Sequence, residues 1–129
     1  MILSIRTDNP VAEVGLYQEN GQQIIYQTWQ AHRELSETIF DQIDNILGQK
    51  NLKYSDLTGV IFYEGPGSFT GLRIGASLVN SLCFSLNIPT QSATGENWQA
   101  VALTGLKAHP QVEVLPIYGA DPHITTPKK

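Results

Sequence analysis

The order in which strand-like and helix-like segments follow one another constrains the fold of this 129-residue chain more than any other feature. Residues 2–7, 11–17 and 23–29 have the patterns of three consecutive strands. Asp8-Asn9-Pro10 is typical of a turn, and Asn20-Gly21 is the usual signal of a tight hairpin. Three strands joined by such short turns predict an antiparallel meander.

After the third strand the pattern becomes helical. Apolar residues recur at i, i+4 and i+8 over residues 33–48, which predicts a helix with a wide apolar face. A strand over 58–63, a helix over 69–86, a strand over 89–92 and a helix over 94–106 follow. The order βββαβαβα predicts an α/β domain in which helices cover a mixed sheet. This is the topology of a single ribonuclease-H-like or actin-like lobe.

The length and the proline distribution suggest one lobe and a tail. A chain of this length can bury one compact core but not two. We assign residues 1–108 to the lobe. Residues 109–129 hold four of the seven prolines, and we expect a Pro-rich C-terminal tail there with one short strand over 112–115.

The charge balance argues against strong RNA binding by the chain alone. The net charge is −4, the isoelectric point is near 5.2, and the only basic cluster is Lys128-Lys129. A protein that grips a nucleic-acid backbone presents a basic face, so we expect any RNA to be held by a partner. No run approaches the roughly 18 apolar residues of a membrane span, so no membrane role is expected. A single cysteine and the absence of a signal peptide indicate the cytoplasm.

The helix predicted over 69–86 is apolar on too many sides for a surface helix. Arg73 is its one charged residue, and its polar positions are mostly serines. One interpretation is a helix that packs on its own sheet and also on a partner subunit. The alternative is a helix buried beneath the rest of its own domain.

A glycine-rich loop joins the fourth strand to this helix. Its spacing does not match the P-loop or the GxGxxG pattern, and Pro66 has no N–H to offer an anion. Gly71 and Gly75 are four residues apart, so they would share one helix face and permit close packing on the sheet. The sequence leaves open a structural loop or a phosphate site. In the structural interpretation, in which Ser68 or Thr70 caps the helix, the loop residues are Gly65, Pro66, Gly67, Ser68, Thr70 and Gly71.

The segment Glu-Gly-Pro-Gly-Ser-Phe-Thr-Gly-Leu-Arg-Ile-Gly, residues 64–75, closely resembles the signature of the TsaB/YeaZ family. The first strand, the helix start His32-Arg-Glu-Leu-Ser-Glu37 and the segment 115–129 are similar to the family in the same order. The resemblance implies an actin-like fold and a subunit of the machinery that makes threonylcarbamoyladenosine in tRNA.

The resemblance also implies a pseudo-enzyme with no catalytic, cofactor-binding or metal-binding residues of its own. Family members pair with the catalytic subunit TsaD, an ATPase called TsaE joins them, and tRNA is contacted only indirectly. Homodimers form through the same surface in members without a partner. Pairing uses two helices that correspond here to residues 33–48 and 69–86. The interface residues predicted on them are Leu35, Ile39, Phe40, Ile43, Arg73, Ser77, Val79, Asn80, Leu82 and Phe84.

Two departures from the family pattern stand out. Family members are commonly about 200 residues or more, and the second lobe that they carry before the tail is expected to be missing here. The family's first strand usually reads Ile-Asp-Thr, whereas this one reads Ile5-Arg6-Thr7. A cation at that position would repel Mg²⁺ rather than bind it.

An enzyme remains the alternative. A small ATP-binding or peptidase-like protein of the actin-like superfamily would need a catalytic set, and a Ser-His-Asp triad can assemble in space. However, no GxSxG motif is present. A metal-binding histidine pair on a helix would need a second histidine four residues after His32, and that residue is Ser36. Cys83 falls on the apolar helix face, where a core thiol is expected.

Overall fold

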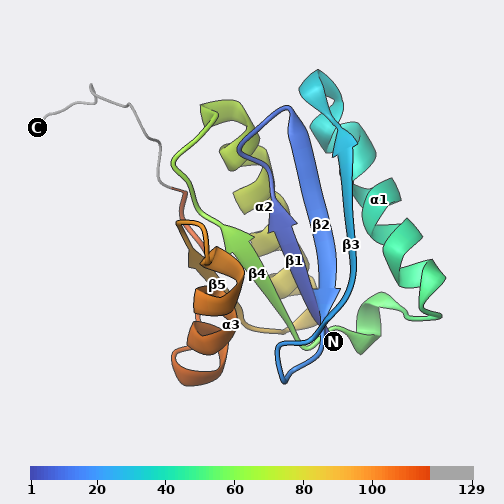
Figure 1. Ribbon diagram of the computed structural model, residues 1–129, viewed down its shortest axis with the longest axis vertical. Helices are drawn as coiled ribbons and strands as arrows, with labels where there is room; N and C mark the ends of the chain where they lie inside the picture. The colour runs from blue at the N-terminus through green and yellow to red at the C-terminus, as the bar shows by residue number, and fades with distance from the viewer. Residues whose placement is uncertain (117–129) are drawn as a thin grey trace, which may run out of the picture.

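The computed structural model describes residues 1–116, and these form one sheet with helices on both sides (Figure 1). The sequence pattern predicted every strand and helix of the lobe in the correct order. The strands are β1 (Ile2–Arg6), β2 (Val11–Tyr17), β3 (Gln23–Gln30), β4 (Gly59–Tyr63) and β5 (Thr90–Ala93), and the helices are α1 (Leu35–Gln49), α2 (Phe69–Leu86) and α3 (Trp98–Ala108).

The sheet is mixed, with strand order β3-β2-β1-β4-β5. β1 pairs antiparallel with β2, and β2 pairs antiparallel with β3, which is the expected meander. β4 then pairs with β1, and β5 with β4, in the parallel sense. Helical crossovers supply those parallel connections, as the alternation of helices and strands predicted.

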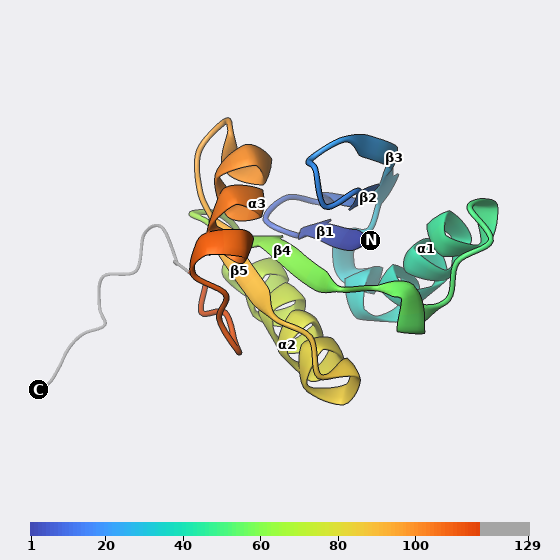
Figure 2. The same ribbon diagram turned by 90° about the horizontal axis from the view of Figure 1, so that it is seen from below.

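Helices α1 and α2 cover one face of the sheet and α3 covers the other (Figure 2). The two-residue period of a strand decides which side chains meet which helix. Thr7, directly after β1, touches α2, whereas a side chain at Gly59 of β4 would collide with Leu106 of α3. The core therefore lies in two layers, with Ile5 and Phe62 among its fully buried residues.

Small shifts separate the observed elements from the predicted ones. A short 3-10 helix, His32–Glu34, precedes α1, so the α-helix begins at Leu35 rather than residue 33. The expected strand over 112–115 does not form. Gln111 makes an isolated bridge to Thr90 instead.

An asparagine side chain replaces the strand partner at this point. The Asn80 Nδ2 donates to the Val114 carbonyl at 3.0 Å, and the Val114 N–H donates to Asn80 Oδ1 at 2.8 Å. Val114 is thereby buried against α2 without a sheet partner. The remainder of the predicted tail, residues 117–129, lies outside the described residues.

The expectation that no segment reaches the size of a membrane span needs correction. Helix α2 is long enough and apolar enough to cross a membrane by length and composition. One such helix is weak evidence, because core helices of soluble proteins pass the same test. Six of its residues are buried, and its glycines contact the end of β1.

Three glycines spaced four residues apart allow the start of α2 to lie directly on the end of β1. A Cβ at Gly71 would stand 2.1 Å from the Thr7 carbonyl oxygen, and one at Gly75 would stand 2.2 Å from Thr7 Oγ1. A Cβ at Gly67 would stand 2.4 Å from the Asp8 Cβ. We call Gly67, Gly71 and Gly75 the glycine seam. The predicted close packing of Gly71 and Gly75 on the sheet is thus confirmed.

Replacing a seam glycine should destabilise the fold. We expect Gly71→Ala to lower the free energy of unfolding by about 1–3 kcal/mol, because the methyl group collides with rigid backbone. Gly48→Ala in α1 is the matched control, since a Cβ added at Gly48 would meet nothing outside the neighbouring helix backbone within 4 Å. It should be neutral or stabilising by about 0.5–1 kcal/mol. Urea unfolding measures both, and equal effects would contradict the seam.

The amino terminus is anchored to the β2–β3 hairpin. The Met1 ammonium lies 2.9 Å from Glu19 Oε2, and Thr58 Oγ1 also donates to that oxygen. The hydrogen bond from Thr58, followed by that from the ammonium, lowers the pKa of Glu19 from 4.5 to about 2. The folded state therefore favours the ionised carboxylate.

This anchor predicts a specific acid dependence. A carboxyl group whose pKa is lower in the folded state stabilises the fold above its unfolded value and loses that effect as pH falls toward the folded value. The stability difference between the wild type and Glu19→Gln should be largest above pH 4.5 and should shrink toward pH 2. Urea midpoints at several pH values measure it. A difference that is constant with pH would contradict the anchor.

Candidate functional site

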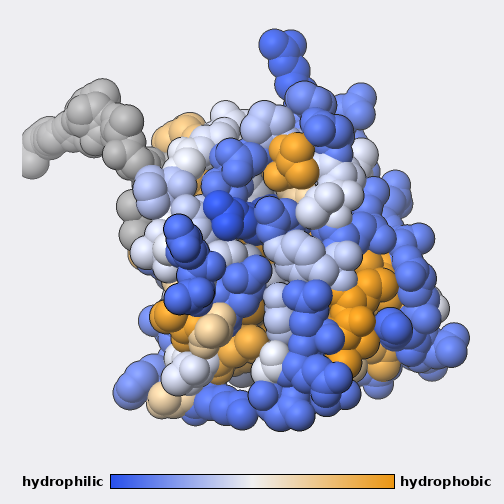
Figure 3. Space-filling view, in the orientation of Figure 1, coloured by the Kyte–Doolittle hydropathy of each residue, from blue (hydrophilic) through white to orange (hydrophobic). Residues whose placement is uncertain are grey.

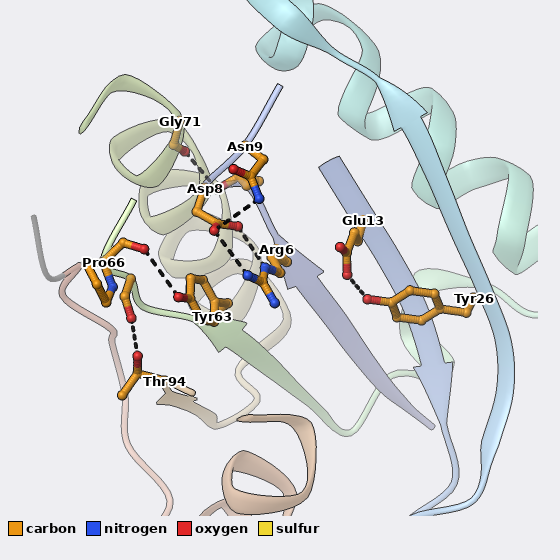
Figure 4. Close-up of polar contacts among 11 residues, drawn as sticks. Arg6, Asp8, Asn9, Glu13, Tyr26, Tyr63, Pro66, Gly71 and Thr94 are labelled. Atoms are coloured by element: carbon orange, nitrogen blue, oxygen red, sulfur yellow. Dashed lines mark hydrogen bonds and ion pairs between the residues drawn. The ribbon is translucent and has the colours of Figure 1, made fainter. Parts of the chain in front are cut away.

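The sequence signature lies where the carboxyl ends of β1 and β4 meet the start of α2 (Figure 4). In sheets of this kind, ligands commonly bind beyond the carboxyl ends of the parallel strands. Here the main chain of the loop is already engaged with the protein. The Ser68 N–H donates to the Asp8 carbonyl at 3.0 Å, and Thr7 Oγ1 donates to the Gly71 carbonyl at 2.7 Å.

An ion pair fills the end of β1. Arg6 Nε lies 2.8 Å from Asp8 Oδ1 and Arg6 Nη2 lies 3.2 Å from Asp8 Oδ2, so the contact is bidentate. The Arg6 guanidinium also lies over the Tyr63 ring, 3.9 Å from its centroid. The hydrogen bond to Asp8 is the main cause of the raised pKa of Arg6. Asp8 is only 7% exposed, so its charge is neutralised almost entirely from within the chain.

The partners of Arg6 are Asp8 and the Tyr63 ring, and the sequence alone did not predict them. Arg6 and Asp8 stand two positions apart, and Figure 4 shows both side chains turned toward each other beside the Tyr63 ring. A guanidinium at this place repels a divalent cation and occupies the nearest carboxylate. Among residues 1–116, no group of three or more His, Cys, Asp or Glu side chains could hold a metal ion.

Hydrogen bonds hold the loop in place from three directions. The Tyr63 hydroxyl donates to the Pro66 carbonyl at 3.2 Å, and Thr94 Oγ1 donates to the Gly65 carbonyl. Ser92 Oγ donates to Glu64 Oε1 at 2.6 Å. These bonds fix the loop, and the N–H groups of Ser68 and Gly71, which an anion would need, already donate to Asp8 and to Ser68 Oγ. The arrangement favours a structural loop over an anion site.

Of the two residues predicted to cap α2, Ser68 and Thr70, the structure shows Ser68 in that role. Ser68 is the N-cap residue of α2, and its Oγ accepts from the Gly71 N–H at 3.4 Å. Thr70 is the second residue of α2 and is exposed. Gly65 adopts a φ of +116°, a value that glycine reaches without strain.

A second polar contact lies farther along the sheet, on β2 and β3. The Tyr26 hydroxyl donates to Glu13, and burial raises the pKa of Glu13 (Figure 4). Glu13 stands opposite Arg6 in the β1–β2 register.

The face of the molecule in front in Figure 1 is mostly hydrophilic, and apolar residues appear on it only in separate patches (Figure 3).

Replacing Arg6 tests how much the Arg6–Asp8 ion pair contributes to the stability of the fold. Arg6→Met leaves the Asp8 carboxylate buried without its cation, and we expect a loss of about 2 kcal/mol in the free energy of unfolding. The double variant Arg6→Met/Asp8→Asn should recover part of that loss, because no unpaired charge remains. Urea unfolding of the wild type and both variants measures this. A single variant as stable as the wild type would show that the pair does not matter.

Four of the ten predicted interface residues are in the wrong place for that role. Helical periodicity identified the apolar face of α1 correctly, but that face packs on the sheet. The same is true of the inward side of α2. The four residues are core residues with at most 4% exposure and cannot reach a partner: Leu35, Ile39, Ile43 and Val79.

Of the other six, four are exposed and two are half-buried. Phe40 is 47% exposed and Phe84 is 89% exposed, and Arg73 and Ser77 also face solvent. Leu82 is half-buried. Asn80 is half-buried and is bonded to Val114, so it anchors the chain's own segment. Which of the six contact a partner stays a prediction.

A groove separates α1 from α2. Its volume is about 480 Å³, and its floor and walls combine apolar side chains with small hydroxyl groups. Three of its eight lining residues are among the predicted interface residues. The other five are not, because only the packing of one helix beside another brings them together. The lining residues are Ser36, Phe40, Thr70, Arg73, Ile74, Ser77, Leu78 and Ser81.

The groove continues into a second hollow at the start of both helices. This hollow has a volume of about 720 Å³ and shares Thr70 and Ile74 with the groove. His32, Arg33 and Glu34 also line it. The two hollows make one continuous depression along the α1–α2 side of the molecule.

Cys83 and Trp98 are both core residues. Cys83 is 2% exposed, and burial raises the pKa of its thiol to about 11, which keeps it protonated at neutral pH. Trp98 is buried at the start of α3 and meets the Tyr63 ring edge-on, with 5.8 Å between the ring centroids. The expected core placement of the cysteine is confirmed.

Comparison with known proteins identifies relatives of this fold. Residues 27–111 match the family described as TsaD, tRNA N6-adenosine threonylcarbamoyltransferase. The chain is 33% identical over 94 residues to the tRNA threonylcarbamoyladenosine biosynthesis protein TsaB of Buchnera aphidicola, a match that covers 73% of this chain and 42% of the relative. It is 30% identical over 93 residues to TsaB of Bacillus subtilis, with 72% and 40% covered.

Solved structures agree with these matches. YeaZ from Pseudomonas aeruginosa superposes with a TM-score of 0.66 at 25% identity, covering 72% of this chain and 43% of that one. RuvC of Thermus thermophilus, at 10% identity, 95% and 84% coverage and a TM-score of 0.52, shares the fold alone. The chain spans about two fifths of the length of the curated relatives cited above. The chain belongs to the TsaD family, and within it resembles the TsaB/YeaZ proteins.

Proposed function

We propose that this chain is a non-catalytic subunit in the biosynthesis of tRNA N6-threonylcarbamoyladenosine, and that it binds a TsaD-like catalytic subunit through α1 and α2. The observation that carries the proposal is the groove between these helices. Proteins called TsaB are named for this biosynthesis, and the TsaD family that matches residues 27–111 is named for the transferase step.

The surface around the groove supports a docking role. Phe40 leaves nearly half of its surface in water, and Ile74 and Leu78 lie in the groove beside it. Ser77 and Ser81 are small, so a helix of another subunit can approach the α2 backbone closely. Burial of this apolar area would favour association, against the cost of the freedom that both partners lose on binding. Helix α2 thus has an inner face for its sheet and an outer face for a partner.

The sheet end supports a role without catalysis. The site where an actin-like enzyme would face its ligand holds the Arg6–Asp8 ion pair, and the loop carbonyls already accept hydrogen bonds from Tyr63 and Thr94. The Cys83 thiol is buried and protonated. The catalytic step is therefore assigned to the partner.

The charge supports indirect contact with tRNA. With a net charge of −4 and only eight Lys and Arg residues, the chain is poorly suited to grip a phosphate backbone by itself. In the proposed complex the TsaD-like subunit holds the tRNA, and a TsaE-like ATPase joins through that complex. A homodimer through the same helices is the competing assembly.

Co-expression with the TsaD-like protein of the same host tests the proposal. We expect a complex that co-elutes in size-exclusion chromatography, and we expect Ser77→Glu in the groove to weaken it at least about tenfold, because the longer side chain keeps a partner helix from approaching the α2 backbone. Val101→Glu is the matched control, since Val101 is 56% exposed on α3, across the sheet. It should bind like the wild type.

The proposal would be contradicted if the chain and the TsaD-like protein did not co-elute, or if Ser77→Glu and Val101→Glu bound equally well. It would also be contradicted if the isolated chain bound ATP in calorimetry at millimolar nucleotide. The last result would favour the alternative of a small ATP-handling enzyme. A thermal melt of each variant shows that it is folded before binding is measured.

A further inference from the structure

The two walls of the groove differ in charge. Glu34, Glu37, Asp41 and Asp44 are spaced by three, four and three residues, so they form one stripe along α1 and the turn before it. All four are exposed. We call these four residues the acidic stripe.

The acidic stripe runs along the solvent edge of the groove. Ser36 and Phe40 line the groove, and Glu37 and Asp41 directly follow them in sequence. Each therefore lies about 100° farther round the helix, on the side away from the buried face. Glu34 lines the adjoining hollow.

Little positive charge opposes the acidic stripe. Helix α1 contains no Lys or Arg, and within residues 1–116 no ion pair joins a stripe carboxylate to a cation. Arg33 and Lys50 flank the two ends of the helix, and the Tyr54 hydroxyl donates to Asp44 at 2.7 Å. On the other wall, α2 contains no Asp or Glu and has the single cation Arg73. The groove is thus lined by apolar and small hydroxyl side chains with Arg73 as its one charged residue, and the negative charge lies beside it on the solvent side of α1.

We propose that this groove takes a basic amphipathic helix of the partner, in which an apolar ridge is bordered on one side by Lys or Arg. The ridge lies on Phe40, Ile74 and Leu78, and the cations lie along the acidic stripe. The inference rests on the proposed function, because it names the chemistry of the partner surface at the same site. Charge complementarity is the reason for choosing this occupant.

The same stripe disfavours a second copy of the chain as the occupant. A two-fold dimer through α1 and α2 brings two acidic stripes to one interface, and like charges repel within the Debye length of about 8 Å at physiological salt. A basic partner removes this repulsion. The stripe therefore selects a different subunit over self-association.

Charge reversal on the stripe tests the inference. In Glu37→Lys/Asp41→Lys we expect affinity for the co-expressed TsaD-like protein to fall about tenfold at 50 mM NaCl, with a smaller loss at 500 mM NaCl. Glu96→Lys/Ala100→Lys/Thr104→Lys raises the net charge by the same amount at exposed positions on α3 and just before it, across the sheet from both helices. This control should lose less than about threefold. Equal losses in the stripe variant and the control, or a stripe variant that binds as well as the wild type, would overturn the inference.

Two synthetic helical peptides keep the inference testable if the TsaD-like protein does not bind at all, a result that would overturn the proposed function alone. The peptides share one apolar face and differ only in a rim of Lys or of Glu. We expect the Lys peptide to bind the wild-type chain at least about tenfold more tightly, and to lose that preference against Glu37→Lys/Asp41→Lys. Equal binding of the two peptides, or binding of neither, would overturn the inference.

Discussion

The contact between the glycine seam of α2 and the end of β1 sets the geometry of the rest of the lobe. Gly71 and Gly75 have no Cβ, so the helix lies directly on Thr7 and accepts its hydroxyl hydrogen bond. A helix pressed this closely to the sheet buries Leu72, Ala76 and Val79 on its inner side. Its opposite side stays in water beside α1, and the groove between the two helices results from that placement.

The same contact accounts for the closed end of the sheet. Gly67 lies against Asp8, and the Ser68 N–H is held by the Asp8 carbonyl. The Asp8 side chain is turned to Arg6, whose guanidinium stacks on Tyr63. Backbone and side-chain groups that could have met a phosphate or a metal ion are thus used to join β1, the loop and α2. The glycine-rich sequence serves packing, and the neighbouring ion pair neutralises Asp8, the one carboxylate buried within residues 1–116.

Periodicity and turn signals were sufficient for the order of elements, the mixed sheet and the apolar face of α1. They could not say which side of a helix meets its own sheet and which meets solvent. Ile39 and Val79 therefore looked like partner residues although they are core residues, while Ile74 and Leu78 in the groove were missed. The expected strand at 112–115 failed for a similar reason, because the Asn80 side chain satisfies Val114 in place of a strand. The Arg6–Asp8 pair depends on rotamers that sequence spacing does not fix.

We propose that the outer faces of α1 and α2 form the partner surface, whereas the sheet end and α3 do not. Hydrogen–deuterium exchange of the chain alone and with its TsaD-like partner distinguishes these surfaces. On binding we expect slower exchange in residues 35–49 and 69–86, with residues 98–108 unchanged. Slower exchange confined to α3, or to the loop at residues 64–67, would contradict it.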